Sequence, residues 1–296
     1  MIYPTIKQLR YFVCLCDELH FGRAAALSFV SQSAFSAAIQ DLEAALDVQL
    51  VDRTNRQVTI TATGQEIATQ ARLCLRDVED LVEKAGQRRM PLTGPLKMGI
   101  IPTIAPFLLP TLLPKLRKAY PELQLYLTED QTDRIHEKLL DGDLDVLVLA
   151  LPYELRSVET LPLFRDRFCL AAREGTDAVE PNNYRFNRLQ ADSILLLEDG
   201  HCLREHALAA CKIRNTEKVS RFAASSLLTL VEMVDADLGI TFLPEMARGS
   251  LLLKNTRVRM YPLDERSYRT IGLVWRKGSA RTEEFTLLGE FIRKHH

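Results

Sequence analysis

The segment Gly200–Cys211, GHCLREHALAAC, groups residue types that could carry out thiol chemistry. Asp199 and Gly200 are typical of a turn, so we expect Cys202 to stand at the start of a helix. Free N–H groups and the helix dipole stabilise a thiolate at that position. His201 and Arg204 would add positive or hydrogen-bond-donating groups beside it. The pattern indicates a nucleophilic thiol, although a free cysteine is more often a small, buried apolar residue.

The spacing of Cys202 and Cys211 excludes a disulfide while the segment is helical. Nine residues of α-helix rise about 13.5 Å and turn the two side chains to opposite faces, whereas a disulfide needs its Cα atoms within about 7 Å. The two thiols can bond only if the helix unwinds, as in a redox switch. A metal site formed with His206 is a weaker interpretation, because Cys211 lies off the face that Cys202 and His206 share. We therefore expect no metal and no cofactor.

Length and composition indicate an ordinary globular protein. With 296 residues and 47% apolar content, the chain can form two or three domains with real cores. The longest apolar run, Val146–Leu151, is too short to cross a bilayer, and the N-terminus has no signal-peptide pattern. Six cysteines are too few for a disulfide framework. We expect a cytoplasmic protein, and its net charge of -1 makes no case for a nucleic-acid or membrane partner.

The N-terminal residues have the pattern of a helix-turn-helix. Thr5 and Gln8 form a predicted capping box, and a second short helix is expected over Arg23–Phe29. Ser31 is a predicted N-cap for a third helix that runs to about Leu46. The expected buried positions are Ile6, Leu9, Val13 and Cys16 on the first helix, and Phe35, Ile39, Leu42 and Leu46 on the third.

A polar face near the start of the third helix suits base reading in a major groove. Its members are Gln32, Ser33, Ser36 and Gln40. A predicted hairpin over Val48–Thr61 would bring Arg53 and Arg56 to phosphates or a minor groove. The alternative is a solvated face of any small helical bundle. Residues 1–90 carry ten Lys/Arg and eleven Asp/Glu. This part of the chain therefore lacks the net positive charge that is usual in a DNA-binding domain.

A long helix with a heptad seam follows the predicted hairpin. A second capping box, Thr63–Glu66, opens it, and the seam consists of Ile67, Ala71, Cys74, Val78, Leu81 and Ala85. Such a seam should pair with a second copy, giving a homodimer. The polar segment Gln87–Pro95 then marks a boundary. The predicted division is residues 1–61 for the winged helix-turn-helix, 62–90 for the linker helix and 91–296 for a regulatory domain.

Strands and helices alternate after this boundary, which predicts a two-lobed α/β domain. Lobe I is expected over residues 95–166 and 268–296, and lobe II over 167–267. The expected strands are Leu96–Ile101, Leu123–Leu127, Leu144–Leu151, Phe168–Ala172, Ser193–Leu197, Gly239–Leu243 and Thr270–Arg276; the expected helices include Ala105–Tyr120, Thr132–Leu140 and Glu283–Lys294. Small ligands bind at the carboxyl ends of such strands. Three loops fit that place: Pro102-Thr103, Gln131-Thr132 and Gly200-His201-Cys202.

The chain resembles the LysR-type transcriptional regulators over essentially its whole length. The matching residues of the N-terminal signature are Ala24, Ala25, Val30, Ser31, Gln32, Ser36, Ile39, Leu42, Glu43, Leu50, Arg53 and Arg56. The segments Leu112–Leu123, Gly142–Ala150 and Gly239–Ala247 look like blocks of the family's effector domain. Ser33 and Phe35 stand where the family more often has proline and leucine.

Within that family, three segments are most similar to the hydrogen peroxide sensors: those that begin at Gly99 and Arg269, and the one that runs through Cys211. The resemblance implies that Cys202 is the peroxidatic cysteine and Cys211 the resolving one. Thr103, Thr132, His201 and Arg269 match positions that line the peroxide pocket. The implied partners are promoter DNA, hydrogen peroxide, RNA polymerase and further copies of the chain in a homotetramer. The resemblance therefore implies a regulator of oxidative-stress genes and not an enzyme. Its rivals are a regulator that binds a small metabolite in the cleft and a thiol peroxidase.

Overall fold

The structure is a computed structural model that describes residues 3–53, 58–85, 90–180, 184, 189–210 and 216–296. The chain divides into two compact units, one formed by Met1–Arg89 with Leu140–Asp143 and the other by Met90–Leu139 with Leu144–His296. No helix in the described part of the chain is both long and apolar enough to span a membrane.

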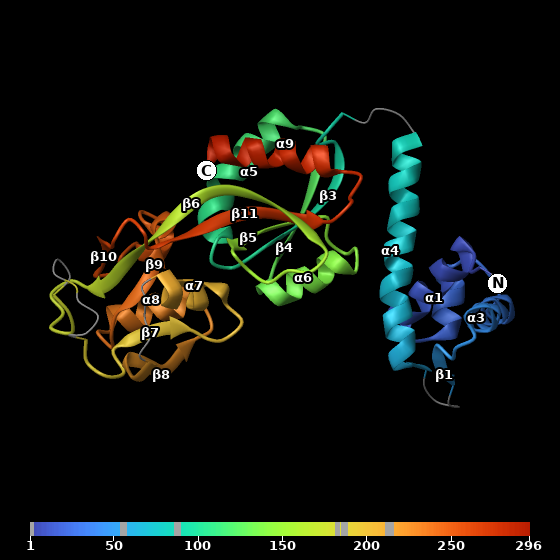
Figure 1. The fold of residues 1–296 in the computed structure, drawn as a ribbon, viewed down its shortest axis with the longest axis horizontal. Helices are drawn as coiled ribbons and strands as arrows, with labels where there is room; N and C mark the ends of the chain where they lie inside the picture. Colours follow the sequence, from blue (N-terminus) through green and yellow to red (C-terminus); the bar gives the residue numbers. More distant parts are fainter. Residues whose placement is uncertain (1–2, 54–57, 86–89, 181–183, 185–188, 211–215) are drawn as a thin grey trace. The chain divides into compact units, whose positions relative to one another are not determined.

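Three short helices build the core of the first unit (Figure 1). They are α1 (Ile6–Glu18), α2 (Phe21–Leu27) and α3 (Gln32–Leu46). The predicted capping box of α1 is confirmed, because Thr5 Oγ1 accepts from the Gln8 N–H at 3.2 Å and Gln8 Oε1 accepts from the Thr5 N–H at 2.8 Å. Ser31 caps α3 as predicted, with its hydroxyl accepting from the Ala34 N–H at 3.3 Å.

Of the four residues predicted to form the buried stripe of α1, only Leu9 and Cys16 pack against the core, and none is fully buried. The buried residues are Tyr11, Phe12 and Leu15, whereas Ile6 is 43% exposed. Leu9, Val13 and Cys16 are only half-buried. The physical reason is the neighbouring helix, because the Tyr11 ring stacks on Phe35 of α3 with 5.0 Å between centroids.

The positions of α2 and the core face of α3 follow from local contacts. α2 starts two residues earlier than predicted, because His20 Nδ1 accepts from the Arg23 N–H at 3.2 Å and caps the helix. Phe35, Ile39 and Leu42 are fully buried, as predicted. Leu46, at the end of α3, is half-buried.

The predicted hairpin is present as strands β1 (Val51–Arg53) and β2 (Val58–Ile60), paired antiparallel. The long helix α4 (Ala62–Ala85) follows, but Thr63 does not cap it. Thr61 Oγ1 accepts from the Gly64 N–H at 2.9 Å and donates to Gln49 O at 2.9 Å, which fastens the helix start to the hairpin. Only glycine fits at position 64, since a Cβ there would lie 2.3 Å from Leu50 O.

The heptad seam of α4 has two different halves. Ala71 is 2% exposed and Ile67 packs on the core of the first unit, so this half is occupied within the chain. Leu81 is 66% exposed. The second half of the seam is therefore the part that is open to a partner.

The second unit contains a mixed sheet with the order β10-β6-β11-β5-β3-β4, and β9 pairs with β6 (Figure 1). Pairing is parallel between β3 and its neighbours β4 and β5, and antiparallel around β11. The strands are β3 (Gly94–Ile100), β4 (Leu123–Glu129), β5 (Val146–Leu151), β6 (Val158–Arg173), β9 (Thr241–Pro244), β10 (Val258–Pro262) and β11 (Tyr268–Arg276). A small parallel sheet joins β7 (Ile194–Leu197) to β8 (Val219–Ala224).

Two hydrophobic cores define the two lobes of this unit. One packs β3, β5 and β11 against α5 (Ala105–Ala119), α6 (Thr132–Leu140) and α9 (Thr282–His295). The other packs β7, β9 and part of β6 against α7 (Cys202–Ala210) and α8 (Leu227–Asp235). As predicted, β11 and α9 return to the first lobe.

Strand β6 is the main feature that sequence patterns missed. Only Phe168–Ala172 is predicted as a strand, yet the strand runs for 16 residues and pairs with β11 and β10 along its length. Pro162 and the charged run Arg165–Arg167 break the apolar pattern. The register with β11 shifts between Ile271 and Gly272, opposite Phe164 and Pro162, and such an irregularity is where a strand tolerates proline. β8, β10 and α8 are likewise not in the prediction.

Candidate functional site

Cys202 is the first residue of α7, as the turn signal at Asp199-Gly200 predicts. Gly200 has a φ of +93°, a conformation that favours glycine and lets the chain turn into the helix. Cys202 is a free thiol and is only 3% exposed. The sulfur is thus enclosed by the two lobes rather than presented on a surface.

A buried arginine from β11 organises the polar groups around this thiol. The Arg269 side chain is fully buried. Its Nη1 donates to Thr103 Oγ1 at 2.9 Å, and its Nη2 donates to Thr103 O at 2.8 Å. Its Nε donates to Asp166 Oδ2 at 3.0 Å. The predicted residues Thr103 and Arg269, 166 positions apart in sequence, are therefore in direct contact.

The charge state of Cys202 reflects two opposing effects. Burial raises the pKa of the thiol above its usual value. Arg269 opposes this rise most strongly, followed by the Thr132 hydroxyl and the peptide N–H groups of Ala150 and Cys202. The net pKa shift is upward, so the expectation that the surroundings favour the thiolate overall is wrong for this state of the protein.

The cation nearest in sequence is not the one that acts on the thiol. Arg204 turns toward the start of the helix, where it pairs with Asp199 at 3.1 Å and donates to Leu197 O at 3.1 Å. These local acceptors hold the guanidinium of Arg204, and Arg204 is not among the leading groups that shift the pKa of Cys202. Arg269, 67 positions further along the chain, takes that role.

The Thr132 hydroxyl is a buried polar group of the site that lacks a hydrogen-bond partner among the described residues. Thr132 begins α6 and is 1% exposed. It is near enough to Cys202 to favour the thiolate. Its Oγ1 nevertheless makes no hydrogen bond of ordinary geometry with any residue that the structure describes. A buried hydroxyl without a partner is unfavourable unless a small polar molecule completes its hydrogen bonds.

His201 and Thr103 also line a separate cavity of about 600 Å³. Most of its other lining residues are apolar, with Glu129, Ser225 and Ser226 as polar exceptions. Cys202 is not among them. The buried His201 is thus next to Cys202 in sequence and also lines a cavity large enough for a small organic ligand.

Other residues at the site are absent from the sequence prediction. Asp166 contacts Arg269, and Met246 contacts both: its N–H donates to Asp166 Oδ1 at 3.2 Å, and its Sδ lies 3.5 Å from Arg269 Nη2. Tyr153 donates from its hydroxyl to Asp133 at 2.8 Å, and burial raises its pKa. Asp166 lies in the charged run Arg165–Arg167, outside the predicted strand Phe168–Ala172, so the sequence carries no signal for it.

The remaining thiols have surroundings that suit structural roles. Cys169 is buried and donates to Glu245 Oε2 at 3.1 Å; burial, followed by that carboxylate, raises its pKa to about 12. Burial also raises the pKa of Cys16 to about 11. Cys14 and Cys74 are half-buried free thiols. Cys211 lies outside the described residues. Within those residues, no three His, Cys, Asp or Glu side chains cluster closely enough to hold a metal ion.

The predicted DNA-reading residues share the start of α3. Gln32, Ser33 and Gln40 are exposed, and Ser36 is half-buried. Arg53 ends strand β1, and Arg56 lies outside the described residues. The helix thus carries three exposed polar side chains and one half-buried hydroxyl at these positions.

Comparison with known proteins supplies the wider context. Residues 6–65 match "Bacterial regulatory helix-turn-helix protein, lysR family", and residues 90–296 match "LysR substrate binding domain". The transcriptional regulator EstR of Acinetobacter baylyi is 39% identical over 292 residues, covering 98% of this chain and 97% of that protein. The dual regulator OxyR of Escherichia coli is 38% identical and covers 98% and 95%.

Solved structures give the same result. A full-length OxyR variant of Pseudomonas aeruginosa superposes with a TM-score of 0.79 at 32% identity, covering 99% of both chains. An OxyR variant of Corynebacterium glutamicum bound to H₂O₂ has a TM-score of 0.66 at 33% identity, covering 99% of this chain and 92% of that one. With both family matches and these full-length relatives, the chain belongs to the LysR family of bacterial transcriptional regulators.

Proposed function

We propose that this LysR-family regulator senses hydrogen peroxide through Cys202 and, on oxidation, changes how it controls oxidative-stress genes. The observation that carries the proposal is the group around the thiol: a buried cation, Arg269, and a buried hydroxyl of Thr132 that has no protein partner among the described residues. A molecule as small as peroxide has the donors and acceptors that such a hydroxyl needs. The similarity to OxyR proteins, one of them bound to H₂O₂, supports the same assignment.

The proposed chemistry oxidises two thiols with one peroxide. The Cys202 thiolate attacks one peroxide oxygen, the O–O bond breaks, and the departing hydroxide takes a proton to become water. The resulting sulfenic acid reacts with the Cys211 thiol, and a second water leaves as the disulfide forms. Because Cys202–Ala210 is helical, α7 must unwind for the two sulfurs to meet. Thr103, Thr132, His201 and Arg269 would hold the peroxide, while Cys202 supplies the nucleophile.

The DNA-binding part of the proposal rests on the first unit. Gln32, Ser33, Ser36 and Gln40 would read bases, and Arg53 and Arg56 would contact the backbone of promoter DNA. Residues 1–61, 62–90 and 91–296 would act as DNA-binding, linker and sensor parts. The linker helix would pair two copies, two such dimers would form a homotetramer, and the assembly would act on RNA polymerase in the cytoplasm.

Two cysteine variants test the sensing step. With Cys202→Ser, about one equivalent of peroxide should leave the free-thiol count unchanged. With Cys211→Ser, the same treatment should give a sulfenic acid at Cys202, which dimedone traps, and no disulfide. Mass spectrometry locates the product in each case. First oxidation at Cys14, Cys16, Cys74 or Cys169 would contradict the proposal.

A second candidate function has an observation of its own. The cavity of about 600 Å³ beside His201 and Thr103 is the size of a small-molecule site, and EstR, at 39% identity, is a family member that is not named for peroxide. This alternative predicts a rise in melting temperature with a panel of small carboxylates, and no change in operator binding on adding peroxide.

A further inference from the structure

Arg269, which contacts Thr103, also forms a buried ion pair with Asp166. Asp166 of β6 and Arg269 of β11 lie directly opposite each other in the strand register, with side chains 2% and 0% exposed. Asp166 Oδ2 accepts from Arg269 Nε at 3.0 Å, and Oδ1 accepts from the Met246 N–H at 3.2 Å. Burial raises the pKa of Asp166, but two oxygens that both accept from N–H donors are the pattern of an ionised carboxylate.

The guanidinium of Arg269 can therefore interact with two negatively charged groups. One is the Asp166 carboxylate, which is in direct contact with the guanidinium. The other is the Cys202 thiolate: α7 packs against β11, and Ile271, two residues after Arg269, pairs with Ala150, which contacts Cys202. Arg269 favours this thiolate more than any other group does. In a water-poor interior, a charge acts strongly on its neighbours. A carboxylate fixed to one edge of the guanidinium offsets part of the positive potential at the sulfur.

We propose that Asp166 limits the reactivity of Cys202, because it fixes the Arg269 guanidinium and neutralises part of the charge that would otherwise stabilise the thiolate. This inference rests on the proposed role of Cys202 as the sensing thiol, and it goes beyond that role by naming what sets its threshold. Without Asp166, the thiolate would become the main counter-ion of a buried arginine. The thiol would then be ionised more of the time and would react with weaker oxidants.

The other ionisable groups around the pair do not replace Asp166. Burial raises the pKa of Tyr153, which keeps its hydroxyl neutral. Burial also lowers the pKa of His206, one turn along α7, so this imidazole is neutral near pH 7. Glu245 acts on Asp166 but pairs with Arg248 at 2.7 Å, and Glu205 is exposed. Asp166 is the carboxylate in contact with Arg269.

The test is the pH dependence of Cys202 alkylation in the full-length protein. Asp166→Asn removes the charge but keeps the size of the side chain. Iodoacetamide labelling, followed by mass spectrometry from pH 5 to pH 10, reports the thiolate without using peroxide. The midpoint should fall by about one pH unit, which corresponds to about tenfold faster labelling below the midpoint. An unmoved or raised midpoint overturns the proposal. Because no peroxide is present, this result is independent of whether peroxide is the natural oxidant.

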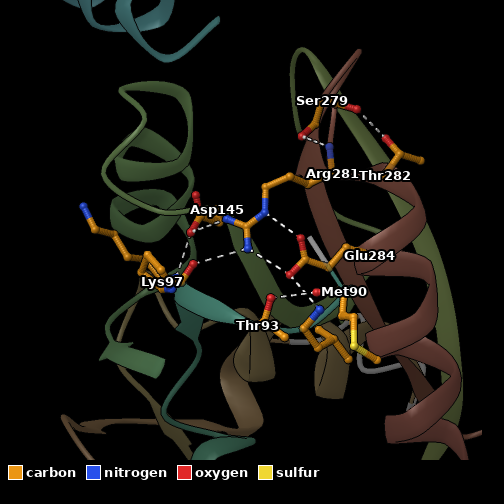
Figure 2. Close-up of polar contacts among 10 residues, drawn as sticks. Met90, Thr93, Lys97, Asp145, Ser279, Arg281, Thr282 and Glu284 are labelled. Carbon is orange, nitrogen blue, oxygen red and sulfur yellow. Dashed lines mark hydrogen bonds and ion pairs between the residues drawn. The ribbon is translucent and has the colours of Figure 1, made fainter. Parts of the chain in front are cut away.

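A matched control comes from the same lobe. Asp145 is a second buried carboxylate, paired with the largely buried Arg281 at 3.2 Å (Figure 2). Asp145 lies just before the amino end of β5, whereas Cys202 contacts Ala150 near the carboxyl end, about 16 Å along the strand. Asp145→Asn should therefore destabilise the fold without moving the alkylation midpoint. An equal midpoint shift in both variants would mean that any buried-pair defect exposes the thiol, and would overturn the proposal.

A double-mutant cycle keeps the inference testable if Asp166→Asn weakens the fold. Asparagine can accept only one of the two N–H donors that Asp166 holds, so some loss of stability is expected. If the variant lowers the raised pKa of folded Cys202, ionisation opposes folding less in the variant than in the wild type, and the stability difference between the two should shrink as pH rises through the variant's thiol pKa. In a Cys202→Ser background the loss should not change with pH over this range. The same pH dependence in both backgrounds would show that Asp166 does not act on the thiol.

Discussion

At the scale of single residues, the chemistry of Cys202 depends on burial and on one cation. Burial disfavours the thiolate, and Arg269 favours it, with a net rise in the thiol pKa. The resting thiol is therefore mostly neutral near pH 7. An oxidant must therefore react with the small ionised fraction of the Cys202 thiol, or must be bound by the groups that favour the thiolate. Thr103 and Thr132 contribute to this in different ways.

Replacing each threonine by valine distinguishes a role in ligand binding from a contribution to the stability of the fold. Thr132→Val removes a buried hydroxyl that has no partner among the described residues, so the free energy of unfolding should stay equal or rise by up to about 1 kcal/mol. Thr103→Val removes the acceptor of Arg269 Nη1 and should cost about 1–3 kcal/mol. Urea unfolding measures both changes. Peroxide oxidation of Cys202 should slow in both variants. Equal destabilisation would mean that Thr132 already has a partner in the protein.

At the scale of elements, a polar network ties the start of the second unit to its last helix (Figure 2). Arg281, just before α9, donates to Glu284 through Nε at 2.7 Å and to Pro95 O at 3.3 Å. Glu284 in turn accepts from the Leu92 N–H at 3.2 Å, and Asp145 accepts from the Lys97 N–H at 2.8 Å. The segment that enters the unit is thereby joined to β3, β5 and α9.

This network should matter far more to stability than a pair on the surface. The Arg281 and Asp145 side chains are 12% and 3% exposed, whereas those of Arg259 and Glu174 are 50% and 60% exposed. Arg281→Met leaves buried carboxylates without their cation and should cost about 3–5 kcal/mol. Arg259→Met, as the matched control, should cost less than about 1 kcal/mol. Chemical denaturation decides between them, and similar costs would show that the network is well solvated.

At the scale of the whole molecule, the proposed regulation involves copies of the chain that associate through α4. Leu81, on the open half of the α4 seam, is 66% exposed within one chain. Large apolar side chains along a helix face are the usual contact of a paired helix. The other half of the seam already packs on the first unit, so pairing through α4 would use the part that includes Leu81.

Leu81→Asp should separate the copies without unfolding the chain. In the monomer the new carboxylate would face water, so thermal unfolding of a diluted sample should change little. In a paired seam, two unpaired carboxylates would be buried at a cost of several kcal/mol. Sedimentation should show smaller species, and affinity for operator DNA should fall with them. An unchanged sedimentation profile would mean that α4 pairs elsewhere or not at all.

The sequence by itself determined the features that depend on neighbours a few positions away. Helix starts at Thr5 and Ser31 follow from side chains that bond the next turn, and the turn before Cys202 follows from Asp199-Gly200. Apolar periodicity located most strands and helices of the second unit within a few residues. It also indicated the loops that carry Thr103, Thr132 and Cys202. These signals are local, so a single sequence contains them.

Only the tertiary structure decided which distant groups meet and how deeply they are buried. Asp166 and Arg269 are 103 positions apart, and strand pairing alone makes them partners. The charged run in β6 interrupts the apolar pattern that predicts a strand. Its long-range pairing with β11 cannot be recognised from the local sequence pattern. Burial at the junction of two lobes also decided the sign of the Cys202 pKa shift, which the helix start suggested would be downward. Desolvation depends on everything that surrounds a group, and no local pattern encodes that.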